Sequence, residues 1–255
     1  MFAKKSLGQN FLIDKNIINK ILSFIDIQNK NVVEIGSGKG ALTDTILGKK
    51  PKSLLIIEKD KKLYDNLRLK YKNLNYITIF NSDILKLDLE KIIKDNSIIF
   101  GNLPYNISSQ ILVKLIKFKK WPPKYTNLIL MFQKEVAEKI IGKSYGRLSI
   151  IAGLKLNFLD KFEVSPNCFS PKPKVKSTLV HMSPKKIKFK IKNLNNLEKI
   201  TNIFFSNKRK MVNKSLRKIL TKNQIAHIEK KYLNLRPENL KPKFYYELVE
   251  LIENG

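Results

Sequence analysis

The sequence has little of the chemistry on which many metal sites and hydrolases depend. Its 255 residues include one cysteine, Cys168, and two histidines, His181 and His227. A single cysteine excludes an intramolecular disulfide and is typical of a reducing compartment. Two histidines give poor support to a histidine-based metal site or a Ser-His-Asp triad, so we expect no bound metal.

Long hydrophobic runs are also absent. No stretch of 18 apolar residues occurs, so a membrane span is not expected. The first residues lack the long apolar region of a secretory leader. We therefore expect a cytoplasmic protein without a membrane partner, and take a monomer as the default state.

Acidic residues are scarce relative to basic ones. The chain has 50 Lys and Arg against 21 Asp and Glu, which gives a formal net charge of +29. Such an excess favours a polyanionic partner, most simply nucleic acid. Only five of the basic residues are Arg, and a Lys-rich composition can also come from an AT-rich genome. Because Asp and Glu did not rise with Lys, that bias weakens the nucleic-acid interpretation only modestly.

Apolar runs alternate with stretches of helical period, which predicts an α/β fold with a mostly parallel sheet. Strands are expected at 31–36, 53–58, 75–80, 97–101, 125–132, 156–164 and 175–182. Helices are expected at 14–27, 41–48, 60–71, 106–117, 133–141 and 147–155. No helix separates the last two strands, so we expect them to form an antiparallel pair at the edge of the sheet.

The pattern changes near Ser183-Pro184. Residues 185–192 alternate Lys with Ile and Phe, which fits either a basic linker or an extended strand. Residues 194–255 read as several short helices, the last from Phe244 to Glu253. With 18 basic and six acidic residues from 185 to 255, this part is strongly positive. We therefore predict two domains, 1–184 and a small, all-α domain at 185–255.

A glycine-rich turn, Glu34-Ile-Gly-Ser-Gly-Lys-Gly40, follows the first long apolar run. A strand, this turn and a helix form the phosphate- or nucleotide-binding start of many α/β domains, since glycine lets the backbone approach a ligand. Gly36, Gly38 and Ala41 also fit the G-x-G-x-x-A pattern, so an NAD site competes with an S-adenosylmethionine (SAM) site. A P-loop does not fit, because Gly40 follows Lys39 and Val33 replaces its first glycine.

Two carboxylates follow the next strands. Glu58 ends the second long strand, 22 residues after Gly36, where it can accept both hydroxyls of a ribose. NAD and SAM enzymes share this feature, so it does not distinguish them. Asp83 follows the third strand and can accept from an adenine amino group, although a turn or helix N-cap is the better explanation for an Asp considered in isolation.

The tetrapeptide Asn102-Leu-Pro-Tyr105 emerges from the buried run 97–101. An adenine amino nitrogen is a poor nucleophile because its lone pair is delocalised, and two acceptors aimed at its hydrogens favour a pyramidal nitrogen. The Asn102 side-chain oxygen and the Leu103 carbonyl can serve as these acceptors. Pro104 fixes the backbone and Tyr105 offers a stacking face for an extruded base. The alternative is an ordinary strand-to-helix turn.

Taken together, these motifs resemble the ribosomal RNA adenine dimethyltransferase family, and within it the KsgA/RsmA type that acts on small-subunit rRNA. The resemblance covers nearly the whole chain. It is carried by SLGQNFL at 6–12, EIGSGKGALT at 34–43, Glu58, Asp83, NLPY at 102–105, YGRLS at 145–149, FSPKPKVKS at 169–177 and the basic tail. The family fold is a Rossmann-like, class I SAM-dependent methyltransferase with a small C-terminal helical domain.

The resemblance implies roles for particular residues. The implied cofactor-binding residues are Gln9, Asn10, Leu12, Gly36, Gly38, Glu58, Asp83 and Asn102. The implied catalytic residues are Asn102, Leu103, Tyr105 and Phe169, with Phe169 stacking on the target adenine opposite Tyr105. Contacts with RNA are assigned to Lys172, Lys174, Lys208, Arg209, Lys210, Lys214 and Arg217. From sequence alone, Phe169 would be read as a packing residue of its loop.

The expected activity is therefore SAM-dependent dimethylation of two adjacent adenosines in a hairpin loop near the 3′ end of small-subunit rRNA, within the assembling subunit. Residues 204–210, FFSNKRK, resemble the tail of this type, although Lys208 replaces its usual first Arg. The alternatives are a large-subunit rRNA adenine methyltransferase of the macrolide-resistance type, a DNA adenine methyltransferase, a non-catalytic RNA-binding assembly or transcription factor, and an NAD enzyme.

Overall fold

The computed structural model describes residues 4, 7–142 and 145–254, which form two compact units. The first unit contains the chain up to Ala137 together with Asn157–Pro184, and the second contains Glu138–Leu156 and the chain from Lys185. Residues 138–156, which precede the predicted boundary at 184, thus group with the C-terminal helices. The assignment of SAM binding and catalysis to 1–184, and of RNA recognition to 185–255, stays a prediction.

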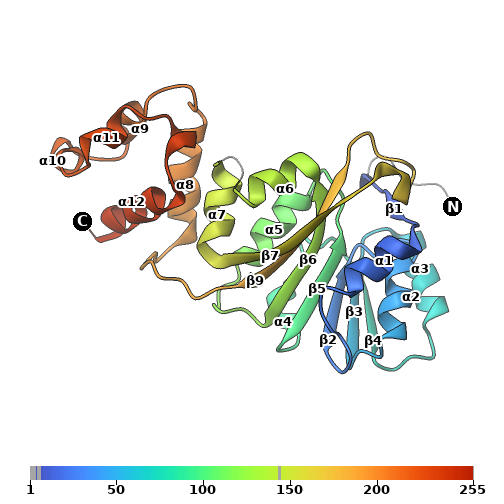
Figure 1. Ribbon diagram of the computed structural model, residues 1–255. Coiled ribbons are helices and arrows are strands. Elements are labelled where there is room, and N and C mark those ends of the chain that lie inside the picture. The colour runs from blue at the N-terminus through green and yellow to red at the C-terminus, as the bar shows by residue number, and fades with distance from the viewer. Residues whose placement is uncertain (1–3, 5–6, 143–144, 255) are drawn as a thin grey trace. The chain divides into compact units, whose positions relative to one another are not determined.

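The first unit is built on a seven-stranded sheet in the order β4-β3-β2-β5-β6-β9-β7 (Figure 1). The strands, in chain order, are β2 (Asn31–Ile35), β3 (Ser53–Glu58), β4 (Ile77–Asn81), β5 (Ser97–Asn102), β6 (Tyr125–Gln133), β7 (Leu156–Val164) and β9 (Ser177–Pro184). From β4 to β6 every neighbouring pair is parallel, and β9 is antiparallel to β6. This confirms the predicted α/β fold with a mostly parallel sheet, and places β7 beside β9 at the expected edge.

Helices lie on both faces of this sheet (Figure 1). On one side lie α1 (Lys15–Leu22), α2 (Ala41–Gly48) and α3 (Lys61–Lys70), and on the other lies α5 (Ser108–Ile116). The chain also forms the short helix α4 (Leu89–Ile92) before β5, and α6 (Lys134–Ile140) after β6. Strands covered on both faces need apolar side chains at successive positions. This is why β5 and β6 read as continuous apolar runs in the sequence.

The strand order places the ends of four strands around one crevice. The chain passes from β2 outward through β3 to β4, and then returns to pair β5 with the other side of β2. At such a reversal the loops that follow the two central strands diverge, and ligands of open α/β sheets bind there. The glycine turn, Glu58, Asp83 and Asn102 therefore come from the carboxyl ends of β2, β3, β4 and β5.

A second, two-stranded antiparallel sheet joins distant parts of the first unit. Strand β1 (Phe11–Leu12) pairs with β8 (Phe169–Ser170), so that Phe11 lies opposite Ser170 and Leu12 opposite Phe169. The Ile13 N–H continues the contact by donating to the Cys168 carbonyl at 2.9 Å. The sequence analysis did not predict either strand.

The second unit is helical. It contains α7 (Arg147–Lys155), α8 (Leu194–Phe205), α9 (Val212–Leu216), α10 (Lys222–Ala226), α11 (Lys230–Leu233) and α12 (Pro242–Asn254). The Phe204 ring packs edge-on against Tyr245, and the Tyr246 hydroxyl donates to the Ile150 carbonyl at 2.7 Å. Residues 185–193 are neither helix nor strand, so the linker interpretation of this basic stretch is the one observed. Within the described residues, no helix has both the length and the apolar character that crossing a membrane requires.

His181, on β9, makes the stability of the first unit sensitive to pH. Its side chain is buried, its Nε2 lies 2.8 Å from the Asn127 Oδ1, and its ring packs against Phe24. Burial lowers the pKa of His181, and Asp160 opposes this only in part. As the pH falls, His181 is therefore protonated in the unfolded chain, near pH 6.5, before it is protonated in the folded chain. Protonation of this residue thus favours unfolding.

We accordingly expect the free energy of unfolding to fall as the pH drops through about 6.5, by at most about 1.4 kcal/mol per pH unit from this group. Urea unfolding followed between about pH 5 and 8 measures this slope. His181→Gln should flatten the slope, whereas His227→Gln, at an exposed residue, should leave it unchanged. An identical slope in His181→Gln would contradict the assignment.

Candidate active site

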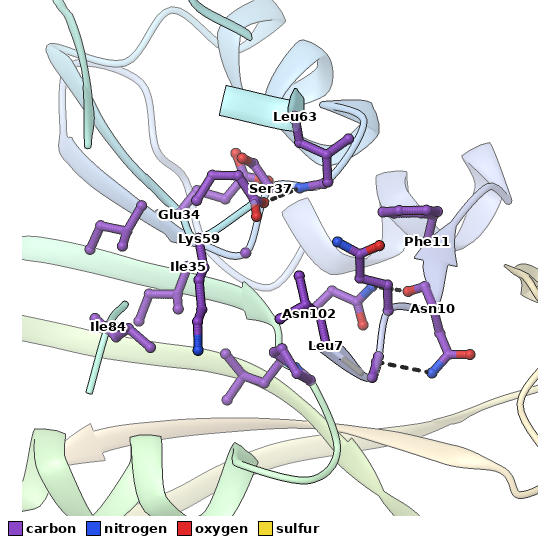
Figure 2. Close-up of a pocket in the computed structure, with 18 of the residues that line it drawn as sticks. Leu7, Asn10, Phe11, Glu34, Ile35, Ser37, Lys59, Leu63, Ile84 and Asn102 are labelled. Carbon is purple, nitrogen blue, oxygen red and sulfur yellow. Dashed lines mark hydrogen bonds between the residues drawn. The ribbon is translucent and has the colours of Figure 1, made fainter. Parts of the chain in front are cut away.

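A cavity of about 350 Å³ opens at the carboxyl ends of β2 to β5 (Figure 2). Its volume lies within the range of ordinary small-molecule sites, about 300–1,000 Å³. The segment Leu7–Ile13 forms one wall, and the ends of the four strands form the others. The cavity brings together all the predicted cofactor-binding residues, Gln9, Asn10, Leu12, Gly36, Gly38, Glu58, Asp83 and Asn102, and also Leu103.

The glycine turn is shaped by both its backbone and its neighbours. Gly36 and Gly38 have φ angles of 74° and 58°, which side chains other than glycine rarely adopt. A Cβ on Gly38 would in addition lie 2.8 Å from the Phe11 ring. Glycine at position 38 thus lets the Phe11 ring of β1 pack directly against the turn, so that these two parts of the cavity lining touch.

Glu58 is held ready to accept hydrogen bonds from a ligand. Its Oε2 accepts from the Gly38 N–H at 3.0 Å and its Oε1 accepts from the Asp60 N–H at 2.8 Å. Burial raises the pKa of Glu58, and the two backbone donors counteract that rise. Each carboxylate oxygen can accept more than one hydrogen bond, so two ribose hydroxyls can still be bound.

Glu34 is a cavity residue that the sequence analysis did not assign. It is only 1% exposed, and the Thr43 hydroxyl donates to its Oε2 at 2.6 Å. Burial raises its pKa to about 8. Glu34 is therefore mostly protonated at neutral pH and does not add a second negative charge beside Glu58. A carboxylate inside the apolar run NVVEI was the signal that could have revealed it.

Asp83 is paired with Lys59, which the sequence analysis also left unassigned. The Lys59 ammonium lies 2.8 Å from the Asp83 Oδ2, and the Leu85 N–H donates to the Oδ1 at 2.9 Å. The bond from Lys59 is the main reason that the pKa of Asp83 is lowered. Asp83 thus stays ionised and keeps lone pairs for an adenine amino group. Lys59 itself lines the cavity (Figure 2).

Asn102 is oriented by the opposite wall. Its side-chain amide donates to the Asn10 carbonyl at 2.8 Å (Figure 2). Because that bond fixes which end of the amide is the nitrogen, the Oδ1 is left as an acceptor in the cavity. Leu103, which follows, is 2% exposed and anchors the loop in the core.

The two predicted stacking residues lie apart from this cavity. Neither Tyr105 nor Phe169 is among the described residues that line it. Tyr105 is half-buried, and its hydroxyl contacts Ser177. Phe169 is 3% exposed and belongs to the buried core of the first unit. Its role in stacking stays a prediction, and Ser6 of the first motif lies outside the described residues.

The predicted RNA-binding residues are all on the surface. Lys172 and Lys174 lie in the exposed loop between β8 and β9 of the first unit. The others are exposed residues of the second unit, namely Lys208, Arg209, Lys210, Lys214 and Arg217. They are available for phosphates, but no contact in the structure tests that role.

Comparison with known proteins identifies the family. The family model described as ribosomal RNA adenine dimethylase matches residues 2–253. The chain belongs to the ribosomal RNA adenine dimethylase family. It is therefore an enzyme, and the family is one of SAM-dependent methyltransferases, as the motifs predicted.

Relatives of this dimethylase extend over the whole chain. Ribosomal RNA small subunit methyltransferase A of Pelagibacter ubique is 47% identical over 99% of this chain and 97% of its own length. A crystal structure of a dimethyladenosine transferase from Plasmodium falciparum superposes with a TM-score of 0.75 at 25% identity, over 95% of this chain and 96% of the other. The 23S rRNA methyltransferase ErmE has the same fold, with a TM-score of 0.71 at 22% identity over 96% of this chain and all of its own.

An unsatisfied hydroxyl in the cavity of this dimethylase indicates that the cavity fits SAM. Ser37 is 8% exposed and lines the cavity, yet its hydroxyl has no hydrogen-bond partner among the described residues. An unsatisfied buried hydroxyl costs free energy unless a ligand supplies the partner. Ser37 follows β2, between Glu58 on β3 and Asn102 on β5. In that order, Ser37 would hold the methionine part of a cofactor whose ribose was bound by Glu58.

We expect Ser37→Ala to weaken SAM binding about tenfold, the loss of one hydrogen bond to a charged group. The melting temperature of the ligand-free protein should stay the same or rise, because the unsatisfied hydroxyl is removed. Titration calorimetry with S-adenosylhomocysteine and with methylthioadenosine, which lacks the amino-acid end, measures the affinities. Scanning calorimetry of the ligand-free protein measures the melting temperature. Equal weakening for the two ligands would contradict the placement of Ser37.

Proposed function

We propose that this enzyme transfers methyl groups from SAM to the amino groups of two adjacent adenosines in a hairpin loop near the 3′ end of small-subunit rRNA. Membership of the ribosomal RNA adenine dimethylase family supports the reaction. The small-subunit methyltransferase of Pelagibacter ubique, 47% identical, supports the substrate, whereas ErmE shares the fold at 22% identity. We infer that it works where small subunits are assembled, in the cytoplasm, and as a monomer.

The observation that carries this proposal is the fixed amide of Asn102. With its nitrogen bound to the Asn10 carbonyl, the Oδ1 can only accept. An adenine amino group offers two hydrogens, one for the Oδ1 and one for the Leu103 carbonyl. Two acceptors in these directions favour a pyramidal nitrogen whose lone pair is available. SAM, when bound, supplies a methyl group on a positively charged sulfur.

Positioning accounts for the rest of the catalysis. Holding two reactants in line contributes a large part of many rate enhancements. Tyr105, next to Pro104, is the proposed platform on which the flipped base stacks, and Phe169 the proposed second face. No strong base is needed, because the nitrogen becomes acidic once it carries a methyl group. It still carries one hydrogen after losing that proton, so a second transfer is possible.

Each of the two units carries exposed cations that are proposed to bind RNA. In the first unit, Lys172 and Lys174 follow Phe169 in the chain, so they can reach phosphates near a flipped base. In the second unit, Lys208 to Lys210, Lys214 and Arg217 are exposed. Contacts of this kind depend on salt, because RNA releases counterions when phosphates are neutralised.

Methyl transfer from labelled SAM tests the proposal directly. Unmodified small subunits, large-subunit rRNA and adenine-containing duplex DNA should be offered in parallel, and products mapped by mass spectrometry. We expect dimethyladenosine only in the small subunit. Asn102→Ala should abolish turnover while RNA affinity stays within a few-fold. Label in large-subunit rRNA would overturn the substrate, and SAM binding without any transfer would favour an assembly factor.

Replacement of Lys208, Arg209 and Lys210 by Gln tests the basic tail. Each lost phosphate contact should lower the slope of log affinity against log salt by about 0.7–0.9. We expect weaker binding to small-subunit rRNA and a flatter salt dependence, measured by filter binding. The matched control changes Lys30, Lys49 and Lys52, which are exposed near the amino ends of β2 and β3. Equal slopes in both variants would contradict the assignment.

A further inference from the structure

Tyr105 is attached to the protein at the far end of its ring. Its hydroxyl lies 2.5 Å from the Ser177 Oγ, a contact between residues 72 positions apart in the chain. Ser177 is completely buried and is the first residue of β9, where it pairs with Gln133 at the end of β6. A hydroxyl pair at this distance is a short but ordinary hydrogen bond.

The strand order shows what this contact spans. Tyr105 follows β5 and Ser177 begins β9, and β6 lies between these two strands. The Tyr105 side chain must therefore cross the carboxyl end of β6 to reach its partner. At the near end, the Ser108 hydroxyl donates to the Tyr105 carbonyl at 3.2 Å. The aromatic ring is thus held by its backbone on one side and by its hydroxyl on the other.

A stacking platform needs this kind of attachment. An aromatic ring can swing about its first side-chain torsion, and a base stacked on it would move with it, whereas a bond to the hydroxyl fixes the far end of the ring's long axis. A phenol keeps its proton at neutral pH, and burial raises the pKa of Tyr105 further, so the bond persists. Ser177 also ends the segment that begins with Phe169 and carries Lys172 and Lys174. One hydrogen bond therefore connects both proposed faces of the target-base site.

We propose that Ser177 is a positioning residue of the methyl transfer, which fixes the position of the Tyr105 ring against the target adenine through the hydrogen bond between the hydroxyls of Ser177 and Tyr105. This inference rests on the proposed function, because it needs an adenine stacked on Tyr105. It adds a residue of β9 to a site otherwise built from the ends of β2 to β5. Ser177 would then act in the reaction as well as in the sheet, unlike residues that only stabilise the sheet.

A double-mutant cycle of Ser177→Ala, Tyr105→Phe and the combined variant tests the inference. Single-turnover methylation of unmodified small subunits should fall about fivefold in Ser177→Ala, the loss of one hydrogen bond. Tyr105→Phe should fall by a similar factor, and the combined variant no further, because both substitutions remove the same bond. Affinity for S-adenosylhomocysteine should stay within twofold in all three.

Thr178→Val serves as the matched control, since it changes a buried hydroxyl of the same strand on the opposite face of the sheet. We expect wild-type turnover in this control. Wild-type turnover in Ser177→Ala, or losses that multiply in the combined variant, would overturn the inference while the proposed function stands. Absence of transfer by the wild-type enzyme would instead remove the proposed function, and the inference with it. Should Ser177→Ala not fold, Ser177→Cys, which keeps the shape but weakens the bond, replaces it in the cycle.

Discussion

The short segment from Gly8 to Leu12 is the constraint on which the rest of the site depends. Its Phe11 ring packs against Gly38, where any Cβ would collide with it. Its Asn10 carbonyl accepts from the Asn102 amide, and its Leu12 lies opposite Phe169 in the β1–β8 pair. One extended stretch thus contacts the glycine turn, the acceptor loop and the segment proposed to hold the target base. Gln9 and Lys4 both reach Asp60, the N-cap of α3, which ties the stretch down at its start.

This arrangement couples the two halves of the reaction. If the segment moves away, the cavity loses a wall and Asn102 loses the bond that decides which way its amide faces. The proposed binding of the donor and the proposed presentation of acceptors to the adenine amino group therefore require the same local structure. Because two strands of two residues contribute few hydrogen bonds, the segment depends on the burial of Phe11 and Leu12 for its stability. The apolar side chains of β1 thereby set the geometry of polar groups on three other elements.

The sequence predicted the main sheet well because its strands are buried on both faces and leave continuous apolar runs, such as Ser97–Asn102. Two helices, α2 and α7, have the expected bounds, although neither N-cap residue makes a side-chain cap hydrogen bond. Strands β1 and β8 were not, since two residues cannot show a period. Glu58, Asp83 and Asn102 could be predicted as neighbours because parallel strands end at one edge. The neutral state of Glu34, the pairing of Lys59 with Asp83 and the burial of Phe169 depend on contacts between distant segments, which no local pattern records.

The distribution of charge suits two ligands of opposite sign. The cofactor carries a positive charge, and the cavity is lined by the acidic side chains of Glu58 and Asp83, which are proposed to bind its ribose and its adenine. RNA is a polyanion, and the lysines that attract it are exposed, where salt screens each charge beyond about 8–10 Å. A surface of net charge +29 would repel a cationic cofactor if its field reached into the cavity undiminished. The acidic side chains in the cavity and the lysines on the surface thus present opposite charges to the two proposed ligands, and the raised pKa of Glu34 lowers the negative charge gathered beside Glu58.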